Sequence, residues 1–430
     1  MTAPFFIRVD SWLSDDLHCA EESATMAALQ IIVDQTVATR VEDRRARSVR
    51  DTINVSTYPV ALWLASNWWR LRWESTAYQD QQVDWRLSHV MTSSGSGYIW
   101  PPLVIHGDGN GVFLDMRQYR RSEIGESDLK FIETFKSYVS GSDFEFAVSD
   151  FVERVLDRLS EMQVRDTDLH KVWSVLCAER ADQTLSWQRK LEATLGFDPE
   201  VGDQDLVLGL VRVATEHGEG VAEELAAAER DHAPDIASRI SALLATADTW
   251  RPPVNMRGIE PVRLGEDRPY EMGYRKAMDF RAALGRGSGP LSNTDMAEIF
   301  GLNEQLLEGR QSGPIGVAER RGSADHLLLR SGGILPRRFE ISRLAADLLF
   351  VANDDDWSLA TRSRTARQQF QRAFAAEFLC PVLGIKAQVS RAASEDDIEE
   401  VAAAYGVTPF TVQRQMVNAG MLSSEVLGHQ

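Results

Sequence analysis

The chain has 430 residues, 43% of them hydrophobic and 26% charged. These proportions are typical of a soluble globular protein, and the length exceeds what one hydrophobic core usually holds. The formal net charge of −18 excludes general attraction to nucleic acid, so we expect a protein partner. Three widely spaced cysteines without a CxxC pair argue against a disulfide framework and indicate a reducing, cytoplasmic location. No apolar run is long enough to span a membrane.

Residues 1–140 have the composition of a mixed strand and helix domain. The segments AALQIIVDQTVATRV and PPLVIHGDGNGVFLDM predict strands, with a hairpin turn over Gly107–Gly111 in the second. The segment STYPVALWLASNWWRLRWE predicts a helix with Pro59 in its first turn. Because this helix is apolar nearly all round until Arg70, we expect it in the core. The alternative is an aromatic and arginine platform for single-stranded nucleic acid.

Residues 141–250 predict a helical domain, because apolar side chains recur at helical spacing, for example from Phe151 to Leu159. The segment Trp250–Gly258, WRPPVNMRG, is the best candidate for a linker. A third domain is then expected over residues 259–430. The predicted fold class is α+β and predominantly helical.

The third domain begins with the helical segment RPYEMGYRKAMDFRAALG and continues with two short helices around Gly301. A short strand, ADHLLLRS, precedes the helix RRFEISRLAADLLF, and the helix TARQQFQRAFAAEFLCP follows it. The end of the chain predicts a helix-turn-helix over residues 394–420. Its signals are a capping box, a glycine stop, a second cap followed by proline, and a final glycine: Ser394 with Asp397, Gly406, Thr408 with Pro409, and Gly420.

This order of elements resembles the ImmA/IrrE family of metallopeptidases. Members carry F-x-x-x-H-E-x-x-H on one helix, an F-A-A-x-x-L-x-P ending on the next, and then a helix pair with a V-S or V-T turn. The corresponding segments here are RRFEISRLAAD, RAFAAEFLCP and IEEVAAAYGVTPFTVQRQM. The resemblance covers about residues 269–422 and implies a zincin-like C-terminal domain.

The catalytic positions of that pattern are occupied by other residue types. The resemblance places Arg343 and Asp347 at the two histidines, Leu344 at the glutamate and Gln368 at the third ligand. Zinc peptidases need two imidazoles one turn apart, a third ligand and a carboxylate base. Arginine is a permanent cation and leucine cannot take a proton. We therefore expect no metal, no cofactor and no catalysis at this site.

Arg343 and Asp347 are four residues apart on the predicted helix, so their side chains are neighbours. Two interpretations stay open. An ion pair between them could replace the metal as a brace of the former site, or they could form an ordinary surface pair worth at most about 0.5 kcal/mol.

A local basic region lies in the same domain. Residues 320–391 hold twelve basic and seven acidic side chains, a net charge of +5 in a chain of −18. Polar side chains of the last helix could reach bases or phosphates, and with three arginines of the basic region they form the predicted nucleic-acid or partner contact: Thr411, Gln413, Arg414, Gln415, Asn418, Arg362, Arg364 and Arg367. The acidic SEDDIEE segment of the preceding helix opposes a DNA contact.

Active members of the resembled family cleave transcriptional repressors. What the resemblance implies here is recognition without cleavage, by a regulatory or scaffold subunit in a bacterial stress response or in phage defence. A DNA-binding regulator that uses the helix-turn-helix is the first alternative. An enzyme with its site in the first 250 residues is the second.

Overall fold

The computed structural model describes residues 4–14, 19–75, 83–117, 128–250, 261–265, 267–309, 312–320, 325–389 and 393–423. The protein is α+β and predominantly helical, which confirms the predicted fold class. It forms two compact units, the first from Met1–Val207 with Gly265–Asp267 and the second from Leu208–Leu264 with Arg268–Gln430. Among the helices of the described residues, none combines the length and the apolar character that crossing a bilayer would need.

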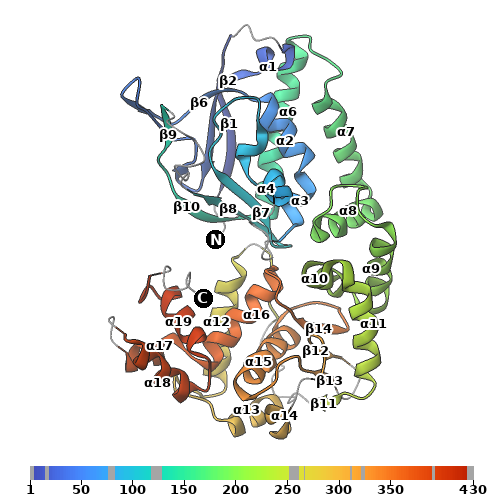
Figure 1. Cartoon of the computed structure of the whole chain (residues 1–430), viewed down its shortest axis with the longest axis vertical. Helices are drawn as coiled ribbons and strands as arrows, with labels where there is room; N and C mark the ends of the chain where they lie inside the picture. The colour runs from blue at the N-terminus through green and yellow to red at the C-terminus, as the bar shows by residue number, and fades with distance from the viewer. Residues whose placement is uncertain are drawn as a thin grey trace. The chain divides into compact units, whose positions relative to one another are not determined.

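Most strands lie in the first unit, and all of its pairings are antiparallel (Figure 1). In one sheet, β2 (Met26–Val33) pairs with β1 (Phe5–Trp12), β3 (Thr36–Val37) and β6 (Ile53–Ser56). Two three-stranded sheets have the orders β10-β8-β7 (Phe135–Ser140, Gly111–Met116, Leu103–Gly107) and β5-β4-β9 (Ser48–Arg50, Val41–Asp43, Leu129–Phe131). The predicted hairpin turn is confirmed between β7 and β8, where Gly109 has φ 89°, a value that glycine adopts without strain.

The helices of the first unit pack an aromatic and aliphatic core against these strands. They are α1 (Ala20–Ala24), α2 (Tyr58–Ser66), α3 (Trp68–Trp73), α4 (Val83–His89), the 3-10 turn η1 (Met91–Ser94), α6 (Gly141–Glu161), α7 (Asp168–Ala181) and α8 (Gln183–Leu195). The predicted core helix divides at Asn67 into α2 and α3. Its core position is confirmed for Trp63, Leu64 and Trp68, which are buried, whereas Trp73 at its end is partly exposed.

The second unit surrounds a four-stranded sheet with helices. Its strand order is β11-β13-β12-β14 (Asp248–Trp250, Asp325–Leu328, Gly316–Glu319, Trp357–Ala360). The helices are α9 (Gln204–His217), α10 (Glu219–Glu229), the turn η2 (Arg230–His232), α11 (Ala233–Leu244), α12 (Pro269–Ala283), α13 (Asn293–Phe300), α14 (Gln305–Glu308), α15 (Ile334–Phe350), α16 (Ala366–Leu379), α17 (Val382–Gln388), α18 (Glu395–Tyr405) and α19 (Pro409–Asn418).

The centre of the second unit is the packing of α16 against α12 and α15 (Figure 1). Rings of Phe280, Phe350, Phe374 and Phe378 contact one another there, with centroids 5.1–6.0 Å apart. Gly273 lets α12 approach closely, because a Cβ at this position would lie 2.3 Å from the backbone oxygen of Phe370. This close approach holds α12 against α16, which carries Arg367 and Gln368 of the candidate site.

The predicted helix-turn-helix is confirmed as α18 and α19. Ser394 and Asp397 form a reciprocal capping box at the start of α18, and Gly406 ends that helix with φ 61°. The Thr408 side chain caps α19 by accepting a hydrogen bond from the Thr411 amide. These are local interactions, which explains why the sequence pattern revealed them.

The expected domain over residues 141–250 is divided between the two units. Its first helices bury Phe144, Phe151 and Leu159 in the strand-bearing core of the first unit. Its later helices α10 and α11 pack on β14 and β13 of the second. Helical periodicity shows that a helix has an apolar face, but not which sheet covers it. Of the linker predicted at Trp250–Gly258, Trp250 is instead a buried residue of β11, and the rest lies outside the described residues.

Candidate functional site between α15 and α16

The structure brings into direct contact two residues that the resemblance aligns with metal ligands. Arg343 on α15 donates a hydrogen bond through Nη2 to Oε1 of Gln368 on α16. The same nitrogen donates to the backbone oxygen of Thr361 at 2.7 Å. Leu344, which the resemblance aligns with the glutamate, is fully buried in the hydrophobic core. Arg343 and Gln368 are therefore adjacent and bound to each other.

Asp347 pairs with an arginine of the neighbouring helix. Nε and Nη2 of Arg367 on α16 donate to the two carboxylate oxygens of Asp347 at 2.7 and 2.6 Å. Nη1 of Arg367 donates to Asp355 at 2.5 Å. Burial opposes the charge of Arg367, but the two carboxylates outweigh it and raise the pKa of this guanidinium.

Both interpretations of an Arg343–Asp347 pair were therefore wrong. Asp347 is fully buried, which excludes a surface pair, and its two oxygens accept both hydrogen bonds of a parallel fork from Arg367. Arg343 turns instead toward Thr361 at the end of β14. A buried ion pair is present, but it joins α15 to α16 rather than two turns of one helix.

The side-chain amide of Gln368 also forms hydrogen bonds with the backbone of the edge strand β14. Its Oε1 accepts the amide of Thr361 at 2.9 Å, and its Nε2 donates to the backbone oxygen of Leu359 at 2.7 Å. Gln371, one turn later, donates to the same oxygen at 2.9 Å. Strand addition by a bound peptide needs free backbone groups at a sheet edge. At β14 the Leu359 oxygen is already bonded to side chains of α16.

A second buried carboxylate approaches from α10. Glu224 accepts a hydrogen bond from Oγ1 of Thr365 at 2.6 Å and a longer one from Oγ of Ser363 at 3.4 Å. Burial raises the pKa of Glu224 to about 7, against the opposing charge of Arg367 and the hydrogen bond from Thr365. The carboxyl therefore takes up a proton near neutral pH.

Arg343 is a cation in an unfavourable place. Burial, and next the like charge of Arg372, lower its pKa to about 9. Its Nε is buried without a hydrogen-bond partner. Within the described residues, no group of three or more His, Cys, Asp or Glu side chains could hold a metal ion. The polar groups of Arg343, Asp347, Arg367 and Gln368 bind one another across the interface between α15 and α16.

Sequence reasoning missed Glu224 and Asp355. Glu224 lies 141 residues before its hydrogen-bond donor Thr365, and no motif links them. Asp355 stands in the run NDDDW, which resembles a solvated loop.

The structure divides the eight predicted contact residues into two groups. Three of them are buried: Arg367, Thr411 and Gln415. The Gln415 amide donates to Glu377 at 2.8 Å and to the backbone oxygen of Cys380 at 3.0 Å, so it attaches α19 to α16. The prediction that these three contact a partner is corrected, because their polar groups are used inside the fold.

The other five predicted contact residues reach the surface. Arg362, Arg364, Arg414 and Asn418 are exposed, and Gln413 is partly exposed. The guanidinium of Arg414 lies 5.8 Å from the ring centroid of Phe410, which is itself 48% exposed. Although Arg414 is exposed to solvent, partial desolvation, and next the like charge of Arg364, lower its pKa, so the two arginines are close enough to repel each other.

Comparison with known proteins gives no relative. No protein-family model, curated protein or solved structure matches this chain. The functional assignment therefore depends on the geometry above.

Proposed function

We propose that this protein is a catalytically inactive relative of the ImmA/IrrE peptidases, which acts in the cytoplasm as a regulatory or scaffold subunit by recognising another protein. The setting that the resemblance implies is a bacterial stress response or phage defence. One observation carries the proposal. The positions that would hold a metal are joined in pairs, Arg343 to Gln368 and Asp347 to Arg367.

These pairs disfavour both metal binding and substrate binding. A divalent cation at this place would meet the positive charges of Arg343 and Arg367 within a partly desolvated site. A peptide substrate would have to displace the side-chain bonds to the Leu359 oxygen on β14. The arrangement stabilises the packing of α15 on α16 and leaves recognition to the outer surface.

The surface that fits a recognition role is the exposed part of the predicted contact residues, Arg362, Arg364, Gln413, Arg414 and Asn418, which we call the arginine face. Its arginines fit an acidic partner surface, and the exposed Phe410 ring adds an apolar contact. A DNA-binding regulator is the second candidate. It is favoured by the position of Gln413, Arg414 and Asn418 on the outer side of the second helix of a helix-turn-helix.

Metal analysis tests the catalytic half of the proposal. We expect purified protein to hold no stoichiometric zinc, and chelation to leave its melting temperature unchanged. Stoichiometric zinc, or peptide hydrolysis that a chelator abolishes, would overturn it. The variant Arg343→His, Asp347→His, Arg367→Gln, Gln368→Glu should gain one zinc equivalent, because the two histidines and the glutamate would then converge and the charge of Arg367 would no longer oppose the metal. Its folding is checked by circular dichroism.

Partner capture tests the recognition half. The double variant Arg364→Glu, Arg414→Glu should lose proteins that the unmodified chain retains from its own cells. The matched control Arg239→Glu, an exposed position on α11, should retain them. Duplex DNA binding with a steep salt dependence, lost in the same double variant, would favour the second candidate instead.

A further inference from the structure

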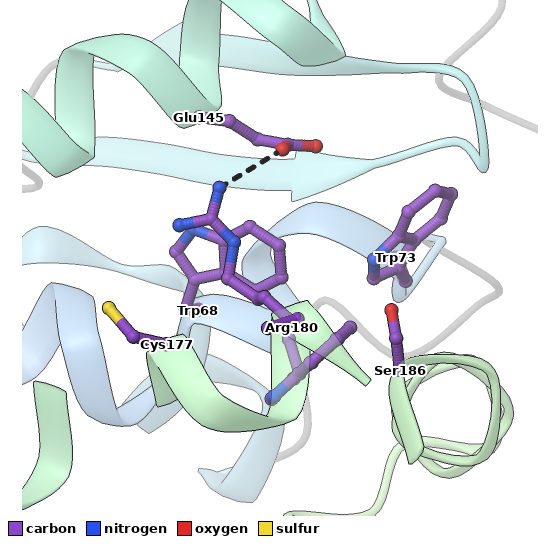
Figure 2. A pocket seen from close by; sticks show the side chains of 8 residues that line it. Trp68, Trp73, Glu145, Cys177, Arg180 and Ser186 are labelled. Carbon is purple, nitrogen blue, oxygen red and sulfur yellow. Dashed lines mark hydrogen bonds and ion pairs between the residues drawn. The ribbon is translucent and has the colours of Figure 1, made fainter. Parts of the chain in front are cut away.

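The first unit contains a pocket that is separate from the candidate site between α15 and α16. Its volume is about 460 Å³, within the range of small-molecule sites. Figure 2 shows Trp68, Cys177 and Arg180 on one side of it and Trp73 and Ser186 on the other, with Glu145 on a third side. The residues come from α3, α6, α7 and α8. The partly exposed Trp73 at the end of the tryptophan-rich segment therefore lines a cavity rather than the core.

Cations lie on the indole rings of this pocket. The guanidinium of Arg180 is 4.6 Å from the ring centroid of Trp68. The Trp73 ring lies 3.9 Å from the Arg72 guanidinium and 4.3 Å from the Lys190 ammonium. Such cation–π contacts hold positive charge beside aromatic surface. The walls therefore offer both apolar area and a positive potential.

The charge of Arg180 is weakly compensated. Glu145 is the acidic residue that lines the pocket, and its closer bond goes to Nε of Arg72 at 2.9 Å. Arg180 is 3.4 Å from the same carboxylate and 3.3 Å from Oγ of Ser149. Both distances exceed the usual range for N–H···O bonds, so these bonds are weak. A stronger hydrogen-bond acceptor inside the pocket could replace these two bonds of Arg180 at little cost in free energy.

Two indole N–H groups in the walls also need an acceptor. Nε1 of Trp68 and Nε1 of Trp73 are buried and have no hydrogen-bond partner. Trp68 is only 2% exposed, whereas Trp73 is partly exposed. A buried donor without an acceptor is unfavourable, because it has lost its hydrogen bonds to water. A ligand with an acceptor oxygen would relieve that cost if the partly exposed Trp73 ring turned its N–H toward it.

We propose that this pocket binds a small ligand that combines an aromatic ring with an anionic carboxylate or phosphate group. The anionic group of the ligand accepts hydrogen bonds from the guanidinium of Arg180 and from an indole N–H. The aromatic ring of the ligand packs between the side chains of Trp68 and Trp73. This inference does not depend on the proposed function of the second unit.

Calorimetric titration of the full chain tests the proposal with benzoate and phenyl phosphate, each beside a neutral counterpart, benzamide and phenol. Inorganic phosphate is included as an anion without a ring. We expect the two aromatic anions to bind more tightly than the neutral compounds and than phosphate. Equal binding of the neutral compounds, or no binding of either aromatic anion at millimolar concentration, would overturn the proposal.

Variants locate the binding. Arg180→Met should weaken the binding of phenyl phosphate at least about tenfold, a loss of about 1.4 kcal/mol, and Arg180→Lys should retain part of it. Arg154→Met on α6, whose side chain is 53% exposed, is the matched control and should bind normally. The ligand should also slow alkylation of Cys177 in the pocket but not that of Cys19. Unchanged affinity in a folded Arg180→Met protein, or no protection of Cys177, would contradict the site.

Discussion

Removing the Arg367 side-chain charge should destabilise the second unit more than any other single change at the candidate site. The substitution Arg367→Met keeps a long, flexible side chain but deletes three charged hydrogen bonds, two to Asp347 and one to Asp355. Asp347 is fully buried and Asp355 is 8% exposed. Breaking a buried ion pair by removing one partner costs about 3–5 kcal/mol, because the remaining charge is left desolvated. Since 1.36 kcal/mol is a factor of ten, the unfolding equilibrium should shift about 10²–10⁴-fold.

The loss of stability caused by Arg367→Met should depend on pH, and its direction can be predicted. In the variant, Glu224 loses the opposing charge of Arg367, so its pKa in the folded state rises further above its ordinary value. A protein that contains a carboxyl whose pKa is raised in the folded state loses stability as the pH rises from the unfolded-state pKa to the folded-state pKa. The destabilisation by Arg367→Met should therefore be smaller at pH 5 than at pH 8.

Hydrogen exchange by mass spectrometry on peptides of α15 and α16, combined with urea denaturation, measures this local stability. Arg343→Met is the matched control. It removes two hydrogen bonds but also a cation that burial and Arg372 disfavour, so its loss should stay below about 1.5 kcal/mol. The reasoning fails if Arg367→Met is as stable as the unmodified protein at pH 8, or if its deficit is larger at pH 5.

Three further predictions concern the same unit. Burial raises the pKa of Glu224 from its ordinary 4.5 to about 7, so the stability of the protein should fall as the pH rises from 4.5 to 7. The variant Glu224→Gln should remove this pH dependence, which is measured by comparing urea midpoints at pH 5 and pH 8. Gln415→Ala should lower the stability of the protein by about 1–3 kcal/mol, because it leaves buried acceptors unpaired. The control Arg414→Ala, at an exposed position, should change thermal stability by less than about 0.5 kcal/mol. Equal effects of the two variants would mean that the buried contacts of Gln415 do not hold α19 in place. Gly273→Ala should cost about 1–3 kcal/mol through overpacking, while Gly287→Ala, with open space around it, should melt like the unmodified chain.

Local chemistry explains which features the sequence alone could predict. The caps at Ser394 and Thr408 and the helix end at Gly406 depend on residues within a few positions of each other. The sequence likewise shows that Arg343 and Leu344 stand where the resembled family pattern has a histidine and a glutamate. Strand composition and hairpin chemistry predicted β7 and β8 for the same reason.

Only the tertiary structure decided which side chains meet. Asp347 binds Arg367 on another helix rather than the arginine one turn away on its own, and Gln415 faces α16 rather than solvent. Helices α6 to α8 belong with the first unit, whereas α10 and α11, from the same predicted helical domain, belong with the second. Spacing along a chain determines which residues share a helix face, but the partner across that face depends on how the helices pack, and no local pattern encodes that choice.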